Sequence, residues 1–81
     1  ADVERTGQGF TYREDTEENR VMFVFDGKPD EATRQILRSH GFRFSPSRDG
    51  KPWVRQLNNA GIWNGQRVFE ALNAARNGDN N

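Results

Sequence analysis

Residues 41–57, GFRFSPSRDGKPWVRQL, decide how the second half of this chain is expected to fold. Phe42 and Phe44 alternate with polar neighbours as in a strand, and the closing WVRQL resumes a strand after a segment rich in turn-forming residues. An Asp-Gly pair inside that segment favours a tight reversal of the chain. The stretch therefore predicts a β-hairpin, and its basic side chains make it a candidate binding surface.

Two more strands are expected nearer the N-terminus. Phe10 and Tyr12 alternate with polar residues, and the charged residues 13–19 join them to VMFVF at residues 21–25. The second of these strands is apolar on both faces. Either both sides of its sheet are covered, or one side is kept for a partner, which leaves a homodimer open.

Helical spacing predicts one helix between the two hairpins and another at the end of the chain. Pro29 suits a first helical position, and Gly41 supplies a stop. The second helix is expected to end near Arg76. Its apolar stripe consists of Val68, Phe69, Leu72 and Ala75. The order of elements predicts an α+β fold of ββαββα type, with one small antiparallel or mixed sheet and two helices mainly on one face.

The composition indicates one small folded domain. Residues 1–9 and 77–81 are polar and are expected to be disordered, which leaves a single α+β domain over residues 10–76. The 81 residues include no cysteine, so disulfides and zinc sites of the cysteine type are excluded. No apolar run approaches the roughly 20 residues that cross a bilayer, and we expect a cytoplasmic protein that contacts no membrane.

Charge is distributed unevenly although the formal net charge is zero, with 12 basic and 12 acidic residues. Residues 1–30 hold eight acids and four bases, whereas residues 31–81 hold eight bases and four acids. Between residues 34 and 67 seven bases accompany a single acid, Asp49. Asymmetry of this kind bears on the binding partners of a protein rather than on its fold.

The basic residues of the first helix and the second hairpin are the leading candidate for a binding surface. Lys and Arg side chains neutralise phosphates, and aromatic rings stack on exposed bases. The alternative is a solvated face whose cations pair with the acids at residues 14–18, a contribution of only about 0 to 1 kcal/mol per pair. The candidate residues are Arg34, Arg38, Arg43, Arg48, Lys51 and Arg55.

Two tryptophans leave alternatives open. Trp53, Arg55 and Leu57 share one strand parity, so the stem of Arg55 either lies along Trp53 or forms a ligand-facing pair with it. The first interpretation, in which the stem of Arg55 lies along Trp53, is favoured, because a domain of this size needs Trp53 in its core. Trp63, near the start of the last helix, is either a core lid or an exposed anchor for a partner.

The sequence carries no arrangement typical of catalysis. His40 is the only histidine, and at a helix end its cationic form interacts well with the dipole. The acids at residues 14–18 match no spacing of a cation-binding loop. Neither a base relay beside a serine nor a glycine-rich phosphate loop is present. We therefore expect no enzymatic activity, no cofactor, no metal and no small-molecule substrate.

Residues 25–57, FDGKPDEATRQILRSHGFRFSPSRDGKPWVRQL, resemble a small domain that recurs in phage and plasmid proteins, often near the end of long polyvalent chains. Its pattern has an FxGKP opening, a helix, a GFRWSP-like strand, WxRxL and a closing helix, and the similarity covers about residues 20–72. Phe44 stands where the pattern more often has Trp, and the loop at residues 47–51 is longer than usual. The resemblance implies mobile-element biology in a bacterial host.

These observations support two main hypotheses. In the first, a non-enzymatic binding module contacts nucleic acid, or a nucleoprotein complex of host defence, through its basic helix and hairpin. In the second, a phage-encoded inhibitor of anti-CRISPR type binds a host protein complex through the acidic residues 14–18 or through Trp63, by analogy with other small mobile-element proteins. A docking domain of a longer chain is a third. The balanced charge fits the last two slightly better, because dedicated nucleic-acid binders are usually basic.

Overall fold

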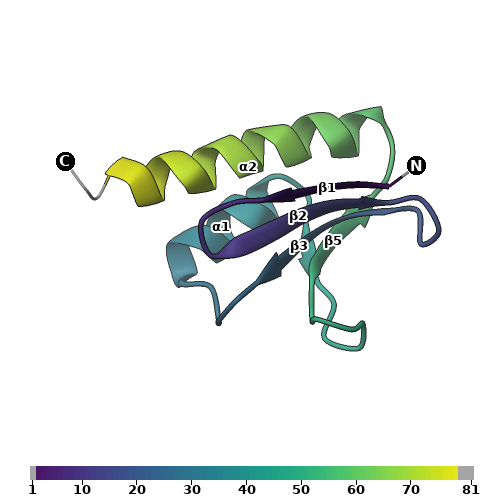
Figure 1. The fold of residues 1–81 in the computed structure, drawn as a ribbon, viewed down its shortest axis with the longest axis horizontal. Coiled ribbons are helices and arrows are strands. Elements are labelled where there is room, and N and C mark those ends of the chain that lie inside the picture. Colours follow the sequence, from purple (N-terminus) through teal and green to yellow (C-terminus); the bar gives the residue numbers. More distant parts are fainter. Residues whose placement is uncertain (1, 79–81) are drawn as a thin grey trace.

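The structure, a computed structural model, describes residues 2–78, with side chains up to residue 75. It is an α+β fold, as the sequence predicted, with one strand more than expected (Figure 1). The elements are β1 (Val3–Thr6), β2 (Phe10–Asp15), β3 (Arg20–Phe25), α1 (Glu31–Ser39), β4 (Arg43–Phe44), β5 (Trp53–Gln56) and α2 (Asn59–Gly78).

The five strands form one sheet in the order β1-β2-β3-β5-β4, and every neighbouring pair is antiparallel. Figure 1 shows α2 lying along one face of this sheet, with α1 beside it. The register places Tyr12 opposite Phe23 and Phe10 opposite Phe25. Because side chains alternate between the two faces of a strand, these rings point together toward the helices.

Aromatic rings fill the space between the sheet and α2. Phe23 contacts Phe42 edge to face at a centroid distance of 5.1 Å, and Phe10 contacts Phe69 in the same manner at 5.3 Å. Such pairs add about 0.5 to 1.5 kcal/mol to the burial of the rings themselves. The core comprises Phe10, Tyr12, Val21, Phe23, Leu37, Phe42, Trp53, Val68, Phe69 and Leu72.

Local signals set the ends of α1. The side chain of Asp30 accepts a hydrogen bond from the backbone N–H of Thr33 at 2.9 Å, so Asp30 is the N-cap and the helix begins at Glu31, two residues after the proline expected to open it. At the other end Gly41 has a φ of +83°, and the N–H of Phe42 donates to the carbonyl of Leu37. The stop predicted at Gly41 is confirmed.

The second helix begins after Asn58, whose side chain accepts a hydrogen bond from the N–H of Gly61 at 2.7 Å. It extends to Gly78, two residues beyond the predicted end near residue 76. Gly65 faces the sheet, where a Cβ atom would lie 2.8 Å from the ring of Tyr12, so its missing side chain lets α2 approach β2. Neither helix of the described residues combines the length and apolarity needed to cross a membrane.

The prediction that residues 1–9 are disordered is wrong for β1. This strand pairs with β2 from Val3 opposite Glu14 to Thr6 opposite Thr11. The guanidinium of Arg5 lies 4.3 Å from the centroid of the Phe69 ring, which fixes β1 to α2. All four side chains of β1 are exposed, so the strand has no apolar alternation to reveal it. Of the tail expected at residues 77–81, residues 79–81 lie outside the described part of the chain.

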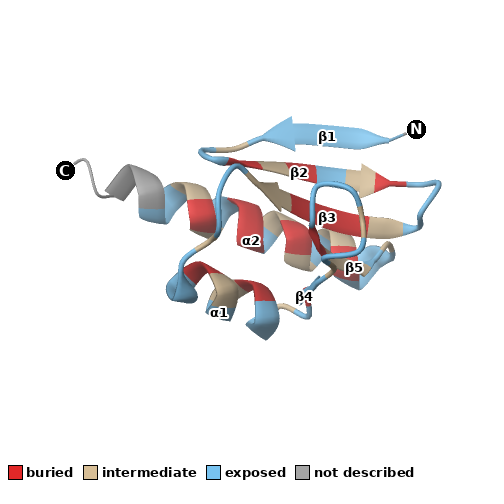
Figure 2. Cartoon of the chain, turned by 90° about the horizontal axis from the view of Figure 1, so that it is seen from below, coloured by how far each residue is buried: buried red, intermediate tan, exposed pale blue. Residues whose placement is uncertain are grey.

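The loop between β4 and β5 covers part of the second face of the sheet. It lies in front of β3 when the sheet is viewed from below (Figure 2). A Cβ atom on Gly50 would lie 3.4 Å from Val24, and Arg48 forms an ion pair with Glu18. Met22 is only 7% exposed as a result. The chain itself thus covers both faces of β3 at these residues.

Candidate functional site

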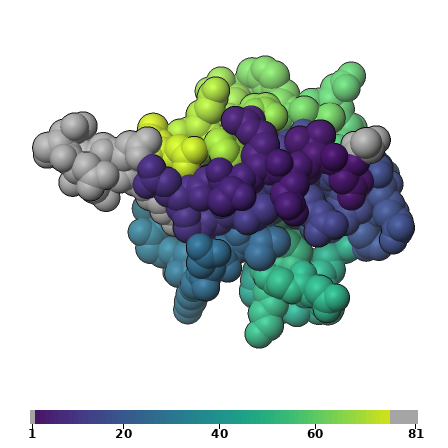
Figure 3. Space-filling view, viewed as in Figure 1, coloured from purple at the N-terminus to yellow at the C-terminus, as the bar shows by residue number. Residues whose placement is uncertain are grey.

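A pocket of about 390 Å³ lies between two loops at one end of the sheet. One wall is the segment that leads from β3 to α1, and the other is the loop that leads from β4 to β5. In Figure 3 the blue and blue-green segments project below the rest of the molecule with a hollow between them. We call this the aromatic-lysine pocket. Its side chains come from Phe25, Lys28, Pro29, Phe44, Lys51 and Trp53, and Gly27 and Gly50 complete the lining.

The aromatic wall of this pocket combines one buried ring with one exposed ring. Trp53 is 6% exposed, whereas Phe44, directly opposite it in the β4–β5 pair, is 50% exposed. Their ring centroids are 5.5 Å apart and their planes meet at 37°. Trp53 therefore supports Phe44 from the core side, and much of the phenyl ring remains accessible from solvent.

The cationic part of the pocket consists of the only two lysines in the chain, Lys28 and Lys51. Both are exposed, and neither forms an ion pair within the described residues. No acidic residue lines the pocket. An ammonium group is a strongly hydrated point charge that binds phosphate and carboxylate groups well. The pocket is thus suited to an anion that also carries an apolar or aromatic surface.

The backbone of the β4–β5 loop holds Lys51 at this position at some cost. Lys51 has a φ of +48° and follows Gly50 at +79°, so two successive residues lie in the left-handed region. Only glycine enters that region without steric penalty. Hydrogen bonds from Lys51 N–H to the carbonyl of Arg48 at 3.0 Å and from Ser45 N–H to that of Pro52 at 2.8 Å close the loop. Strain of this kind persists where the surrounding structure enforces it, and it often marks functional sites.

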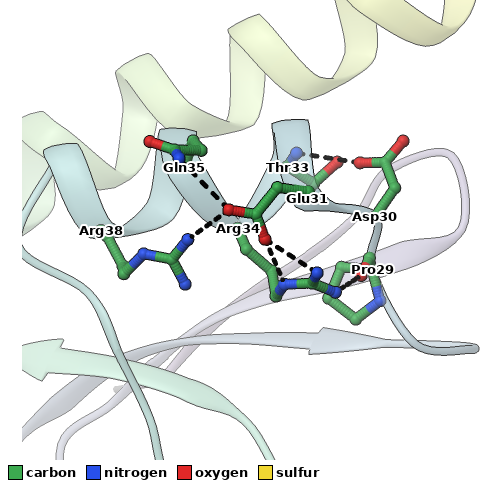
Figure 4. Close-up of polar contacts among 7 residues, drawn as sticks. All are labelled: Pro29, Asp30, Glu31, Thr33, Arg34, Gln35 and Arg38. Atoms are coloured by element: carbon green, nitrogen blue, oxygen red, sulfur yellow. Dashed lines mark hydrogen bonds and ion pairs between the residues drawn. The ribbon is translucent and has the colours of Figure 1, made fainter.

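The two basic residues predicted on α1 already have an acidic partner. Both Arg34 and Arg38 form ion pairs with Glu31, at 2.8 and 3.0 Å, and Gln35 donates to the same carboxylate (Figure 4). The hydrogen bond from Arg34 is the main reason that the pKa of Glu31 lies below its ordinary value. The count of charges between residues 34 and 67 did not include Glu31, which lies three residues before Arg34.

The remaining candidate arginines occupy three different environments. Arg43 is exposed on the edge strand β4 opposite Val54, with no ion pair among the described residues. Arg48 pairs with Glu18, as the hypothesis of a solvated, paired face proposed. Arg55 lies on the helix side of the sheet, where its Nη1 donates to the carbonyl of His40 at 2.7 Å. The candidate cations therefore differ in how free they are to bind a ligand.

Trp63 is exposed on α2, away from the core. Its side chain is 61% exposed, and the guanidinium of Arg67 lies 4.8 Å from the centroid of its ring. Of the two interpretations, core lid and exposed anchor, this geometry fits the anchor. Exposed Trp and Arg side chains are the residue types that dominate binding energy at protein interfaces.

The other polar groups that the sequence singled out have local structural partners. Nδ1 of His40 lies 2.8 Å from the carbonyl oxygen of Ile36, within the last turn of α1. Asp15 accepts a hydrogen bond from the N–H of Glu18 at 2.9 Å and closes the β2–β3 turn. In the described part of the chain no group of three or more His, Cys, Asp or Glu side chains is arranged to hold a metal ion.

Lys28 and Phe25 were not among the predicted binding residues, although both lie in the FxGKP motif. The motif spans Phe25–Pro29 in sequence and supplies one wall of the pocket, while Phe44 of the GFRFSP stretch and Trp53 supply the other. The FxGKP motif itself was the signal available in the sequence, whereas its position beside Phe44 and Trp53 is seen only in the fold. Comparison with protein-family models, with curated protein sequences and with solved structures found no match to this chain.

Proposed function

We propose that this chain is a non-enzymatic binding module of phage or plasmid type that contacts nucleic acid in the cytoplasm of a bacterial host. The observation that carries the proposal is the aromatic-lysine pocket. There an exposed phenyl ring, Phe44, shares a cavity with two lysines that form no ion pair with any acid in the described part of the chain. A cationic groove lined with aromatic rings is the arrangement by which many proteins bind nucleic-acid strands.

The electrostatics of the chain indicate modest affinity with a measurable but shallow dependence on salt. The net charge is zero, so the chain as a whole does not attract the polyanion, and binding depends on local basic groups. Each phosphate neutralised contributes about 0.7 to 0.9 to the slope of log affinity against log salt. If Lys28 and Lys51 each bind one phosphate, we expect a slope near −1.4 to −1.8 from these two contacts.

Fluorescence anisotropy with labelled DNA and RNA at low and moderate salt tests the proposal. The variant Lys28→Gln/Lys51→Gln is expected to lose binding and most of the salt slope. A matched control, Arg13→Gln/Arg67→Gln, removes the same two positive charges outside the pocket. Absence of binding by the wild-type protein at low salt, or equal loss in both double variants, contradicts the proposal.

A second candidate function is inhibition of a host defence complex by protein–protein contact. It rests on Trp63 and Arg67, whose stacked side chains form an exposed aromatic and cationic patch on α2. Capture of a defence complex from nuclease-treated host lysate tests it. The complex is expected to bind the wild-type chain and Phe44→Ala but not Trp63→Ala. Capture that survives in Trp63→Ala, or that is lost on nuclease treatment, contradicts it.

A further inference from the structure

We infer that the ligand of the aromatic-lysine pocket is single-stranded nucleic acid, with one unpaired base stacked on Phe44 and neighbouring phosphates bound by Lys28 and Lys51. This inference rests on the proposed function and narrows it from nucleic acid in general to one unpaired strand. Three features of the pocket carry it: the accessible ring, the open space beside it and the rigid loop that positions one lysine.

The accessible ring favours an unpaired base. Phe44 is supported by buried Trp53, so the platform is held in place before a ligand arrives. In a duplex the flat faces of the bases are covered by their neighbours, whereas a base in a single strand can turn out and stack on an aromatic side chain. Duplex phosphates can reach the lysines, but duplex bases cannot use the ring.

The ring of Phe44 also differs from the other exposed aromatic ring. One face of the Trp63 ring is occupied by the guanidinium of Arg67, which lies over it. Among the described residues no cation lies over Phe44. No cation thus competes with a ligand for this ring, and the two lysines line the same pocket.

The pocket that contains Phe44 is also lined by a glycine, Gly27, with open space around it. A Cβ atom built on Gly27 would meet no atom within 4 Å, although Gly27 lines the pocket. Glycine at such a place lets a ligand approach the backbone closely. A larger side chain at residue 27 would therefore add bulk to the lining of the pocket without disturbing the folded chain.

The loop that carries Lys51 is fixed before binding. Its left-handed backbone, the hydrogen bond between Ser45 and Pro52, and the ion pair of Arg48 with Glu18 all restrict it. Little ordering entropy then remains to be lost when a phosphate binds. Glycine would suit the left-handed backbone at residue 51 better than lysine does, but it would not supply a positive charge. Binding of a phosphate by Lys51 therefore accounts for a lysine at this strained position.

The experiment compares labelled oligothymidylate and oligouridylate with a blunt-ended duplex of two complementary strands of equal total phosphate number, by anisotropy at low salt. The wild-type chain is expected to bind at least one single strand more tightly than the duplex. Phe44→Leu keeps an apolar side chain but removes the π face, and we expect it to weaken single-strand binding by about five- to a hundredfold. Phe44→Trp is expected to bind as tightly or more tightly, and duplex binding should be equal in all three.

Gly27→Leu provides a second test that does not alter the ring. It is expected to block single-strand binding while the melting temperature stays within a few degrees of the wild-type value. Reductive methylation of Lys28 and Lys51 with a ¹³C label, which keeps their charge, gives side-chain NMR signals for both. Both signals should move when oligothymidylate is added.

The outcomes separate this inference from the proposed function. If single strand and duplex bind equally, and neither Phe44→Leu nor Gly27→Leu weakens the single strand, the chain binds nucleic acid but the inference is overturned. Single-strand binding that moves neither lysine signal also overturns it. If the wild-type chain binds no nucleic acid at low salt, the proposed function fails. Displacement of bound oligothymidylate by a poly-glutamate peptide at equal charge concentration would indicate a protein ligand and would overturn the inference.

Discussion

Arg55 on β5 donates a hydrogen bond through Nη1 to the backbone carbonyl of His40, at 2.7 Å, and so ties the sheet to the C-terminal end of α1. A Cβ atom on the next residue, Gly41, would lie 2.8 Å from the same Nη1 atom. The glycine therefore serves two purposes, since it adopts the left-handed turn that ends α1 and leaves room for the guanidinium. Arg55 thus lies on the same face of β5 as buried Trp53 because its guanidinium has a hydrogen-bond acceptor there, the backbone carbonyl of His40.

Loss of this contact should destabilise the fold. Arg55→Met keeps an apolar stem but removes the donor and leaves the His40 carbonyl without this partner. We expect the free energy of unfolding to fall by about 1.5 to 3 kcal/mol, the range for hydrogen bonds from charged groups. Urea denaturation followed by circular dichroism measures it. Arg43→Met, at an exposed edge position, should change stability by less than about 0.5 kcal/mol, and equal losses in both variants would contradict the assignment.

The close approach of α2 to β2 depends on Gly65. In Gly65→Ala the new methyl group would lie 2.8 Å from the ring of Tyr12 and 3.2 Å from Val21, both fully buried. Alanine is the better helix former by about 1 kcal/mol, but overpacking a core typically costs about 1 to 3 kcal/mol. We expect a net loss of stability in thermal melts. Gly27→Ala is the matched control and should melt at or slightly above the wild-type temperature, because open space surrounds residue 27.

The sequence predicted those elements that bury apolar side chains. Phe10 and Tyr12 in β2 and Phe23 in β3 alternate toward the core, and the Asp30 and Gly41 signals lie at the two ends of α1. The strand β1 could not be predicted in this way. Its stability comes from backbone pairing with β2 and from contacts of single polar side chains, such as the hydrogen bond of Arg5 with Gln66 at 2.8 Å. Neither leaves a periodic pattern in VERT.

The candidate site was only partly predictable for a related reason. Lys51 was identified from local charge, but Lys28 lies in a different loop, and only the fold brings the two into one pocket. Charge counting also ignored partners outside the chosen window, so Arg34 and Arg38 were included although Glu31 pairs with both. Which cations lack acidic partners depends on distances in space, and a sum of charges along the chain does not contain that information.

Replacement of Lys51 by glycine should raise stability and lower affinity together. Lys51→Gly relieves a left-handed backbone that glycine adopts freely, so we expect the free energy of unfolding to increase by up to about 1 kcal/mol. Binding of oligothymidylate should weaken, and its salt slope should become shallower by roughly 0.7 for the lost phosphate contact.

Lys51→Arg keeps both the charge and the strain, and it should resemble the wild-type chain in both measurements. A Lys51→Gly variant that is less stable than the wild type would show that the backbone at this residue is not strained.

Tyr12, the only tyrosine, makes the alkaline stability of the fold directly observable. Burial, followed by its 2.6 Å hydrogen bond to Glu14, raises the pKa of this phenol well above its ordinary value of 10.0. The unfolded chain releases the proton near pH 10 and the folded chain keeps it, so the stabilisation is complete below about pH 10 and is lost as the pH rises toward the folded-state pKa.

Tyrosinate absorbance should therefore appear together with the loss of the circular dichroism signal of the fold. Tyr12→Phe, which removes the hydrogen bond to Glu14, should be less stable at neutral pH and should lose this part of the pH dependence. Tyrosinate formed near pH 10 in a chain that is still folded would contradict the burial of Tyr12 between the sheet and α2.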